Sequence, residues 1–484
     1  MKNRTGIIIT LFIVFIGAVL LFFRQTGMGP GQMLNNSSKN TQNKVALLRE
    51  TPLPIPPLLK DENPDPQKAE FQIIAQKGTT EFIKGKKAET LGYNGNYFGP
   101  VIRVRRGEEV SIKVKNNLDE QTTVHWHGLE VNGDQDGGPH DGIKPGTIWN
   151  PTFTINQPAS TLWYHPHLLH KTGEQVYKGL AGLFYIDDDI SDNLDIPKEY
   201  GVNDVPLVIQ DKTFDSNGSF SYNLGMHDVM MGLQGDTILV NGAISPYLQV
   251  PSGQMRLRLL NGLNARSYQI HLSNNQAFVQ IASDGGFLTE PVEMTNIILG
   301  PGERAEIIID FSKFEKGDTV SLMDQETKFM RFSIGSKSNK TVNLPSKFTD
   351  IQRIDPSSAI KTRKFSFQGM GPNVNINGKQ MDMDRIDEVL TLHTTEIWEV
   401  TNDTGGMMGG MPHPFHAHGT QFQILDRDGN PPPANETGWK DTFLVYPGEK
   451  VRAIATFNHT GTFMYHCHIL EHEDAGMMGQ FQVK

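Results

Sequence analysis

The sequence predicts an all-β protein built from three β-sandwiches in tandem. Three segments of the 484-residue chain carry apolar residues at every second position, as half-buried strands require. Turn-forming residues are frequent, with 48 glycines and 28 prolines, and long amphipathic helical patterns are scarce beyond the N-terminus. Many short strands with frequent turns are typical of sandwiches, and a chain of this length has room for about three domains.

The N-terminal segment, residues 1–23, is predicted to insert into a membrane. Gly6 to Phe23 is a run of 18 uncharged residues, which is just long enough to cross a bilayer as a helix. Lys2 and Arg4 precede the run, and this favours a cytoplasmic N-terminus and an exported body. Because no small-residue cleavage site follows, we expect a retained anchor rather than a cleaved signal peptide. Both alternatives place the body outside the cytoplasm.

Residues 24–69 are predicted to form a flexible linker, because Asn, Ser and Pro dominate and apolar periodicity is weak. The alternative for its PLPIPPLL part is a segment that lies along the surface of the body.

Three related units follow, at about residues 70–190, 200–345 and 362–484. Each unit contains an Asn-Gly turn signal and then an alternating run that ends in asparagine. The turn signals are Asn94-Gly95, Asn241-Gly242 and Asn377-Gly378. This faint repetition predicts that the three sandwiches share one architecture.

A stronger repeat links the first and third units. HWHG (His125 to Gly128) corresponds to HAHG (His416 to Gly419). TLWYHPH (Thr161 to His167) corresponds to TFMYHCH (Thr462 to His468). The middle unit has no such histidine pairs, so we expect it to act as a scaffold.

The composition narrows the function classes. The net charge of −10 argues against general nucleic-acid binding. The single cysteine, Cys467, excludes an intrachain disulfide. The 16 histidines and 19 methionines beside that one cysteine indicate metal chemistry.

Four His-x-His pairs carry this indication, where chance would give about 0.5. They are His125/His127, His165/His167, His416/His418 and His466/His468. Residues i and i+2 of a strand point to the same face, so each pair presents two imidazoles together. Eight imidazoles with few neighbouring carboxylates suit copper better than calcium or magnesium, and exceed what one tetrahedral zinc needs. The alternative is a set of buried structural histidines.

Cys467 stands between the two histidines of the last pair and, on a strand, would face the opposite side. His413 and His472 are near it in sequence, and Met477 follows it by ten residues. Two His and one Cys with a weak axial Met define a blue-copper electron-transfer site. The alternative is an inert buried thiol.

The motifs HWHGLEVNGDQDGGP, LWYHPH, HPFHAHGTQFQIL and HCHILEHEDAGMM resemble those of the multicopper oxidases, within them the bacterial three-domain laccases and copper-efflux oxidases. The resemblance covers residues 70–484 and implies three cupredoxin-like Greek-key sandwiches with four coppers per chain. It implies a type 1 copper on His413, Cys467 and His472 with Met477 axial, and a type 2 copper on His125 and His416. The residues implied for the type 3 pair are His127, His165, His167, His418, His466 and His468.

The implied reaction couples four one-electron oxidations of a reductant to the reduction of O2 to water. Electrons would pass from the type 1 copper through Cys467 to His466 and His468. Asp136 and Glu473 match acidic positions that the family uses for proton delivery. The alternatives are a turn-forming role for Asp136 and a ligand-orienting role for Glu473.

The reductant is left open between a phenol, as in laccases, and Cu(I) or another metal ion, as in copper tolerance. The chain has no long Met-rich insertion over the type 1 site, and this favours a more open site and phenols. Soft thioethers nevertheless suit Cu(I). Smaller methionine groups remain at Met226, Met230, Met231, Met381, Met383, Met407, Met408 and Met411, and Gly409 replaces an acidic residue of the efflux oxidases.

A copper carrier without oxygen chemistry is the non-enzyme alternative, and the complete ligand set speaks against it. The unpaired histidines are expected to be structural or on the surface; they are His140, His170, His227, His271, His393 and His459. Nothing in the sequence specifies an oligomeric state.

Overall fold

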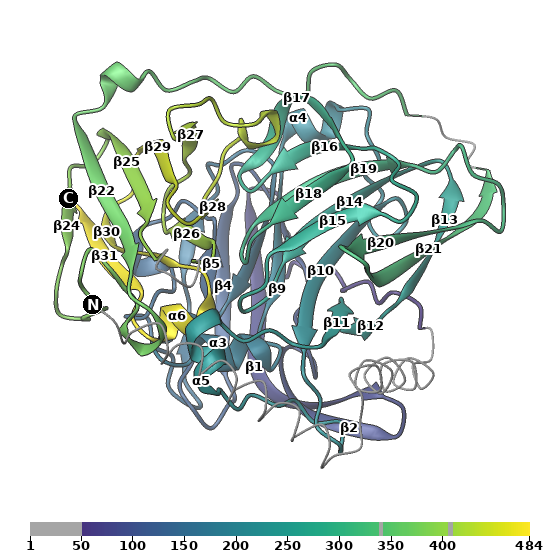
Figure 1. The fold of residues 1–484 in the computed structure, drawn as a ribbon, viewed down its shortest axis with the longest axis horizontal. Coiled ribbons are helices and arrows are strands. Elements are labelled where there is room, and N and C mark those ends of the chain that lie inside the picture. The colour runs from purple at the N-terminus through teal and green to yellow at the C-terminus, as the bar shows by residue number, and fades with distance from the viewer. Residues whose placement is uncertain (1–50, 338–341, 405–409) are drawn as a thin grey trace, which may run out of the picture. The chain divides into compact units, whose positions relative to one another are not determined.

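The computed structural model describes residues 51–337, 342–404 and 410–484. The predicted membrane anchor and most of the predicted linker lie outside the described residues. Among the described residues, no helix is both long and apolar enough to cross a membrane. The regular structure of the described chain is mostly β-strand, in six sheets that form three sandwiches, which confirms the predicted fold class (Figure 1).

The first sandwich pairs two sheets. One sheet has the order β2-β1-β4-β6, with β7 on β4, and the other has the order β3-β9-β8-β5. The strands of the first sheet are β1 (Lys68–Ile83), β2 (Lys86–Tyr93), β4 (Glu109–Asn116), β6 (Ile148–Trp149) and β7 (Thr152–Thr154). Those of the second are β3 (Ile102–Arg105), β5 (His125–His127), β8 (Ser160–His165) and β9 (Gly182–Asp187). Short helices η1 (Gly133–Gln135), α3 (Thr172–Tyr177) and α4 (Asp189–Asn193) lie in its connections.

The second sandwich is the largest. Its strands in the sheet order β12-β11-β10-β14-β19-β16-β17 are Ala243–Ile244, Thr237–Val240, Asp204–Lys212, Gln254–Asn261, Arg304–Asp310, Phe278–Ser283 and Gly286–Met294. Its other sheet, β13-β21-β20-β15-β18, comprises Tyr247–Ser252, Thr327–Lys337, Thr319–Asp324, Tyr268–Leu272 and Asn296–Leu299. One short helix, α5 (Met226–Met231), lies between β10 and β11.

The third sandwich has two five-stranded sheets. The sheet β23-β22-β25-β29-β27 comprises Asn375–Ile376, Lys361–Gln368, Thr395–Asn402, Lys450–Thr456 and Gln423–Arg427. The sheet β24-β31-β30-β26-β28 comprises Glu388–Leu390, Met478–Val483, Gly461–Cys467, His413–Ala417 and Thr442–Val445. The helices are η2 (Pro356–Ser358), η3 (Gly371–Asn373), η4 (Ala434–Glu436) and α6 (Leu470–Asp474).

The predicted repeat of one unit is visible at atomic detail in the three Asn-Gly turns. Asn94, Asn241 and Asn377 all adopt positive φ, which asparagine tolerates better than most residues. Each side-chain oxygen accepts a hydrogen bond from a strand N–H at 2.7–2.8 Å, and each amide donates to a carbonyl two residues earlier on that strand at 2.8–2.9 Å. In each sandwich that strand also pairs in parallel with a later strand.

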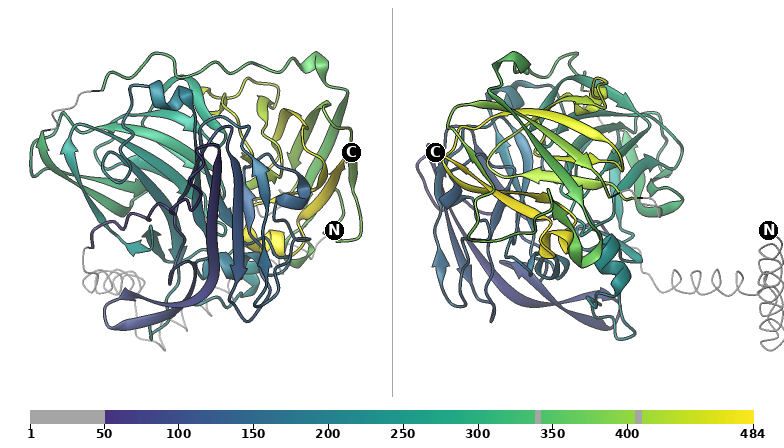
Figure 2. Two further views of the ribbon diagram at one scale, coloured as in Figure 1. Left: turned by 180° about the vertical axis from the view of Figure 1, so that it is seen from behind. Right: turned by 60° about the vertical axis from the view of Figure 1, so that its left-hand side comes forward.

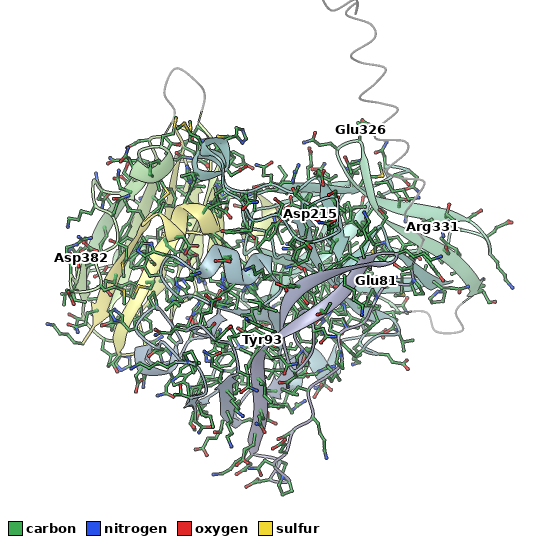
Figure 3. The ribbon with its side chains drawn as sticks, turned by 90° about the horizontal axis from the view of Figure 1, so that it is seen from below. Glu81, Tyr93, Asp215, Glu326, Arg331 and Asp382 are labelled. Atoms are coloured by element: carbon green, nitrogen blue, oxygen red, sulfur yellow. The ribbon has the colours of Figure 1, made fainter. Side chains whose placement is uncertain are left out.

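Each sandwich has its own apolar core, with Trp126 in the first and Trp398 in the third fully buried. A further cluster joins the first two sandwiches, where Trp163 and Tyr185 pack with Leu260. In Figure 2 (left) the first sandwich lies in front, between the second and the third. Figure 3 marks the three by Tyr93 on the first, Arg331 on the second and Asp382 on the third.

The proline-rich stretch after residue 50 is an exception to the linker prediction. Leu53 is buried and its N–H donates to Tyr247, while Leu59 donates to Val101. The carbonyls of Pro54 and Pro56 accept hydrogen bonds from Asn241 and Tyr200. Proline lacks an N–H but keeps its carbonyl, so this stretch packs along the first two sandwiches instead of forming a free tether.

Candidate metal centre

The single cysteine lies at a three-residue site within the third sandwich. Cys467 ends β30, His413 begins β26, and the two strands are paired there through Phe415 and Cys467. His472 comes from α6. The Cys467 Sγ is 3.2 Å from His413 Nδ1 and 3.9 Å from His472 Nδ1, and all three side chains are buried. The structure therefore brings these three predicted ligands together.

Met477 is buried in the same core as Cys467. Its carbonyl accepts the Cys467 N–H at 3.0 Å, and its own N–H donates to the His472 carbonyl at 2.8 Å. The backbone thus keeps Met477 beside the site, and its axial role stays a prediction. Burial raises the pKa of the Cys467 thiol, so a bound cation is needed to hold it as a thiolate near neutral pH.

The eight paired histidines form one cluster between the first and third sandwiches. Strand pairing aligns them: His125 is opposite His165, and His416 is opposite His466. All eight side chains are at most 1% exposed. Only the first pair lies wholly within a strand, because His167, His418 and His468 follow the ends of β8, β26 and β30.

The donor atoms of the cluster divide into compact sets whose members lie within 4.8 Å of one another. These sets are His127/His165/His468, His167/His418/His466, His125/His416/His418 and His127/His416/Asp441. The structure thus brings all eight predicted residues together, four from each of two sandwiches. It adds Asp441, which the sequence analysis did not single out.

The chemistry of these donors fits bound metal. Burial, and then the neighbouring imidazoles, hold the pKa of His127, His167, His416 and His418 well below the usual value, so the rings are neutral and ready to ligate. The Nε2 atoms of His167, His418 and His466 lie 3.0–3.3 Å apart. The Nε2 atoms of His125 and His416 are buried without a hydrogen-bond partner among the described residues. Such convergent, unpartnered nitrogens are what a metal would satisfy.

Two aspartates repeat one hydrogen-bonding pattern across the cluster. The main-chain oxygen of Asp136 accepts from His125 Nδ1 at 3.1 Å, and its carboxylate accepts from His418 Nδ1 at 2.7 Å. In the second instance, the main-chain oxygen of Asp441 accepts from His416 Nδ1 at 2.9 Å, and its carboxylate accepts from His127 Nε2 at 3.0 Å. Asp136 of the first sandwich therefore binds His125 of the same sandwich and His418 of the third. Asp441 of the third sandwich binds His416 of the same sandwich and His127 of the first.

The stacking of rings follows the same crossover. His125 stacks on His418 and His127 stacks on His416, each with ring centroids 3.7 Å apart. The predicted duplication of HWHG and HAHG is therefore a duplication of geometry as well as of sequence. The stacked rings bring the first and third sandwiches into contact at the cluster.

Asp136 has no positively charged partner other than histidine in the described part of the chain. Its contacts are to His125 and His418, and its Oδ1 is buried without a hydrogen-bond partner. A cavity of about 360 Å³ lies on this side of the cluster, lined by Gly138 and Asp141 among others. Burial, and then the Asp136 charge, raise the pKa of Asp141 to about 7. A second carboxyl group, that of the partly buried Asp141, therefore lies at this cavity near Asp136.

Glu473 lies on α6 between the two sandwiches. Its carboxylate oxygens are 3.5 Å from His167 Nδ1 and 3.3 Å from His466 Nδ1, and it is 1% exposed. Burial, followed by the charges of Asp474 and Glu471, raises the pKa of Glu473 well above the usual value. The residue therefore contacts one histidine of each sandwich and favours a bound proton in the metal-free protein.

The sequence analysis missed Arg304, a fully buried residue of β19 in the second sandwich. Its guanidinium binds Asp441, with Nη1–Oδ1 at 2.7 Å and Nη2–Oδ2 at 2.5 Å. Burial opposes the charge of Asp441, but Arg304, Gln421 and Thr442 outweigh it, and the pKa of Asp441 is lowered. The middle unit is therefore more than a scaffold, although no local spacing in the sequence signals it.

Several methionines line one of two cavities. A cavity of about 30 Å³ beside His413 and His472 is lined by four of them, Met230, Met231, Met370 and Met411. The Met230 carbonyl of α5 accepts a hydrogen bond from His472 Nε2 at 3.1 Å. Met383 instead lines the cavity near Asp136, and Met407, Met408 and Gly409 lie outside the described residues.

The unpaired histidines lie away from the convergent nitrogens. His140 bonds Gln480 at 2.8 Å and His170 bonds the carbonyl of Asp474 at 2.6 Å, so both connect the first sandwich to the third. His227 is 84% exposed.

Comparison with known proteins identifies the family. Family models described as "Multicopper oxidase" match residues 74–191 and 352–484. A protein named multicopper oxidase mco from Staphylococcus haemolyticus is 48% identical over 414 residues, covering 85% of this chain and 88% of that protein. The structure is similar to a laccase from Pediococcus acidilactici, with a TM-score of 0.86, 42% identity and coverage of 90% and 94% of the two chains.

A protein named cell division protein FtsP from Escherichia coli is also similar, at 35% identity over 457 residues, covering 90% of this chain and 93% of FtsP. The family assignment rests on the matched models, the close relatives and the laccase structure together. On this evidence the chain belongs to the multicopper oxidases, a family of copper-dependent oxidoreductases.

Proposed function

We propose that the protein holds four coppers, oxidises a small reductant one electron at a time beside Cys467, and reduces O2 to two waters at the eight-histidine cluster. The observation that carries this proposal is the set of eleven buried His and Cys donors, which converge as three at one site and eight at another. A carrier protein needs only the smaller site.

In this proposal His413, Cys467 and His472 would hold the type 1 copper, and Met477 beside them would be a further, weaker ligand. His125 and His416 hold the type 2 copper. The type 3 pair is held by His127, His165 and His468 on one side and by His167, His418 and His466 on the other. Bound copper would supply the one-electron transfers and the four-electron reduction of O2.

The chain connects the two sites covalently. Cys467 is bonded to His466 and His468 through the backbone, and each of these histidines belongs to a different nitrogen set of the cluster. The Cys467 carbonyl accepts a hydrogen bond from His466 Nδ1 at 3.0 Å, which orients that ring. This short covalent path would connect copper held beside Cys467 to copper held at the cluster, which is itself fully buried.

Reduction of one O2 to two waters also takes up four protons, and two carboxyl groups are placed to supply them. Asp136 and Glu473 both contact ring nitrogens of cluster histidines. Asp136 has an unpartnered oxygen and a neighbouring cavity, and Glu473 favours its protonated form. Positioned groups of this kind can pass protons to a reaction centre.

The first candidate reductant is a phenol, which would give up electrons at the edge of His413 or His472. A second candidate, Cu(I), is favoured by the four methionines around a cavity of about 30 Å³. That volume suits a single ion better than an aromatic ring, and thioethers are soft ligands.

Copper analysis with absorption spectroscopy on the full chain tests the oxidase proposal. We expect about four coppers, a blue thiolate band and a near-ultraviolet band from the coupled pair. Cys467→Ser should remove the blue band and one copper, and should slow oxidation of any reductant by more than about 100-fold, because a ligand matters more than a residue that only supports one. Zinc or no metal after copper reconstitution would overturn the proposal.

The two reductants are distinguished by the ratio of Cu(I) oxidation to 2,6-dimethoxyphenol oxidation. Met411→Ala should lower this ratio if Cu(I) binds in the methionine-lined cavity. Met226→Ala is the matched control, because Met226 is 82% exposed and does not line the cavity. An unchanged ratio would favour the phenol.

We also infer that the body is exported, supported by the apolar run from Gly6 to Phe23 and the preceding basic residues. Protease treatment of intact cells tests this, because an exported body would be degraded and a cytoplasmic one protected.

A further inference from the structure

We propose that Arg304 of the second sandwich and Asp441 of the third act together as positioning residues for the histidine cluster. Their role is to fix which ring nitrogen of His127 and of His416 faces the metals. This inference rests on the proposed function, since it assigns a task toward the copper that those histidines would hold.

Arg304 is held without freedom to turn. Its side chain is fully buried, and its five N–H donors have five acceptors: two on Asp441, and the carbonyls of Thr161, Gly302 and Asp284 at 2.9–3.1 Å. These acceptors come from all three sandwiches. A guanidinium saturated in this way defines one position and one plane for the carboxylate that it binds.

The Asp441 carboxylate then fixes His127. Paired with Arg304, it is an acceptor only, so the Nε2 of His127 at 3.0 Å must carry the proton. The Nδ1 of His127 is left with its lone pair, 3.4 Å from His165 Nε2, on the side where the metal would bind. The Thr442 hydroxyl donates a hydrogen bond to the same carboxylate oxygen at 2.9 Å and accepts one from His127 Nε2 at 3.0 Å. Both hydrogen bonds reinforce this orientation of the His127 ring.

This orientation is the reverse of the usual one in the cluster. For His125, His165, His416, His418 and His466 the Nδ1 faces a protein oxygen, which leaves Nε2 toward the metal. Only His127, among the cluster rings with a hydrogen bond to oxygen, turns its Nε2 to the protein. The reversed ring therefore needs an acceptor at the right place, and Asp441 supplies it.

The main-chain carbonyl of the same residue fixes a second ligand. It accepts from His416 Nδ1 at 2.9 Å, so the His416 Nε2 carries a lone pair. That nitrogen is buried and unpartnered in the described structure. One residue thus sets opposite ring orientations in two stacked histidines of different sandwiches.

Two glycines show independently that the backbone lies very close to the Arg304–Asp441 pair and to the cluster. Gly128, directly after His127, has φ +94°, and a Cβ there would lie 2.6 Å from Asp441 Oδ2 and 2.9 Å from Arg304 Nη2. Gly302 has φ +83°, and a Cβ there would lie 3.0 Å from the His468 ring. Backbones from the first and second sandwiches are therefore shaped around the Arg304–Asp441 pair and the cluster.

The test compares two buried ion pairs, each of which has its arginine in the second sandwich. The double variant Arg304→Met/Asp441→Asn removes both charges, so neither is left unpaired in the interior. The control is Arg258→Met/Asp204→Asn. Arg258 and Asp204 are equally buried and bonded at 2.7 Å through two nitrogens, and no histidine is among the hydrogen-bond or ion-pair partners of this pair in the described residues.

Two readouts are taken. The first is the ¹⁵N chemical shifts of the imidazole nitrogens in the copper-free protein, which report the protonated nitrogen of His127 and His416. The second is the copper affinity of the cluster relative to the Cys467 site. We expect the Arg304/Asp441 variant to lose the fixed His127 orientation and to bind cluster copper about 10–100-fold more weakly, with an unchanged blue band. The control variant should keep both.

The inference is overturned if the Arg304/Asp441 variant keeps the wild-type ring shifts and copper affinity, or if the control variant changes both equally. Should the double variant not fold, Asp441→Glu provides the same comparison, since it keeps the charge but displaces the carboxylate. Absence of copper binding by the wild type would contradict the proposed function alone. The copper-free ring shifts would still test the positioning role.

Discussion

The two halves of the histidine cluster repeat one pattern but differ in what surrounds the aspartate. Asp136 and Asp441 each hold one histidine of each sandwich. Asp441 is bonded to Arg304 through both oxygens, whereas Asp136 has no arginine or lysine partner among the described residues and keeps one oxygen unpartnered.

This difference suits the two aspartates to different roles, although their side chains are identical. A carboxylate paired with a buried guanidinium stays ionised and cannot easily take up a proton, so it suits a fixed orienting role. A carboxylate without a cation, next to a solvent cavity, lacks that constraint, and this suits the proton-delivery role that we propose for Asp136. The contribution of the second sandwich therefore makes the duplicated halves unequal.

The largest expected effect is on the Asp136 half. Asp136→Asn keeps the shape and the contacts to His125 and His418 but removes the proton-binding group. We expect turnover to fall by about 100-fold with copper content unchanged, as for the loss of a general acid or base. Steady-state oxygen consumption and metal analysis measure both quantities.

Asp134→Asn is the matched control, because Asp134 is exposed and lines the same cavity. It should leave turnover near the wild-type value. Loss of copper from Asp136→Asn would instead assign Asp136 the same orienting role as Asp441 and remove the contrast between the halves.

A second effect concerns the glycines beside the two carboxylates. Gly128→Ala should destabilise the protein by about 2 kcal/mol or more, because φ is +94° and the Cβ would be 2.6 Å from Asp441 Oδ2. Gly138→Ala should change stability by less than about 0.5 kcal/mol, since its Cβ would meet Asp136 Oδ2 at an ordinary 3.6 Å. Chemical denaturation of both variants measures the difference, and equal losses would show that the two halves are packed alike.

The parts of this site that the sequence predicted are those whose partners lie close together along the chain. The histidine pairs and Cys467 are local patterns, in which a spacing of two residues already carries the geometry. The three Asn-Gly turns are local as well, and the fold class that they indicate is confirmed.

Arg304 could not be predicted in the same way. Its partner Asp441 lies 137 residues away, and Asp441 in turn lies 314 residues from His127. No spacing rule connects such residues, and only the docking of the sandwiches brings them together. The proline-rich stretch from residue 51 follows the alternative prediction, a segment along the body, and not the linker prediction. The sequence did not decide between them for a related reason, because the partners Tyr247 and Val101 belong to two separate sandwiches.

The third effect is on the pH dependence of the copper-free protein. Burial lowers the pKa of His472 to about 4 and of His466 to about 3. In the unfolded chain histidine takes up a proton below about pH 6.5. Between pH 6.5 and pH 4 the unfolded state therefore binds more protons, and the free energy of unfolding falls as pH falls, by about 1.4 kcal/mol per pH unit for each such histidine.

Thermal melts of the copper-free chain from pH 7.5 to pH 5 measure this loss. The loss comes from buried histidines of the cluster and of the Cys467 site, so it should persist in His227→Ala, a variant of an exposed histidine. A melting temperature independent of pH over this range would mean that the cluster opens to water when copper is absent.

The smallest effect concerns a carboxylate that joins the same two sandwiches outside both halves. Asp474 of α6 accepts the N–H groups of Thr172 at 3.0 Å and Gly173 at 2.8 Å, at the start of α3 in the first sandwich. Figure 1 shows α3 and α6 side by side.

Asp474→Asn leaves one acceptor oxygen and turns an amide N–H toward a backbone N–H, so we expect a loss of about 1 kcal/mol in unfolding free energy. Both copper bands should remain, because Asp474 lacks the direct contact that Asp136, Asp441 and Glu473 make with cluster rings. Denaturation and absorption spectra on one sample test the two statements together, and loss of the near-ultraviolet band would show that any weakening of this interface, and not only the aspartate pattern, disturbs the cluster.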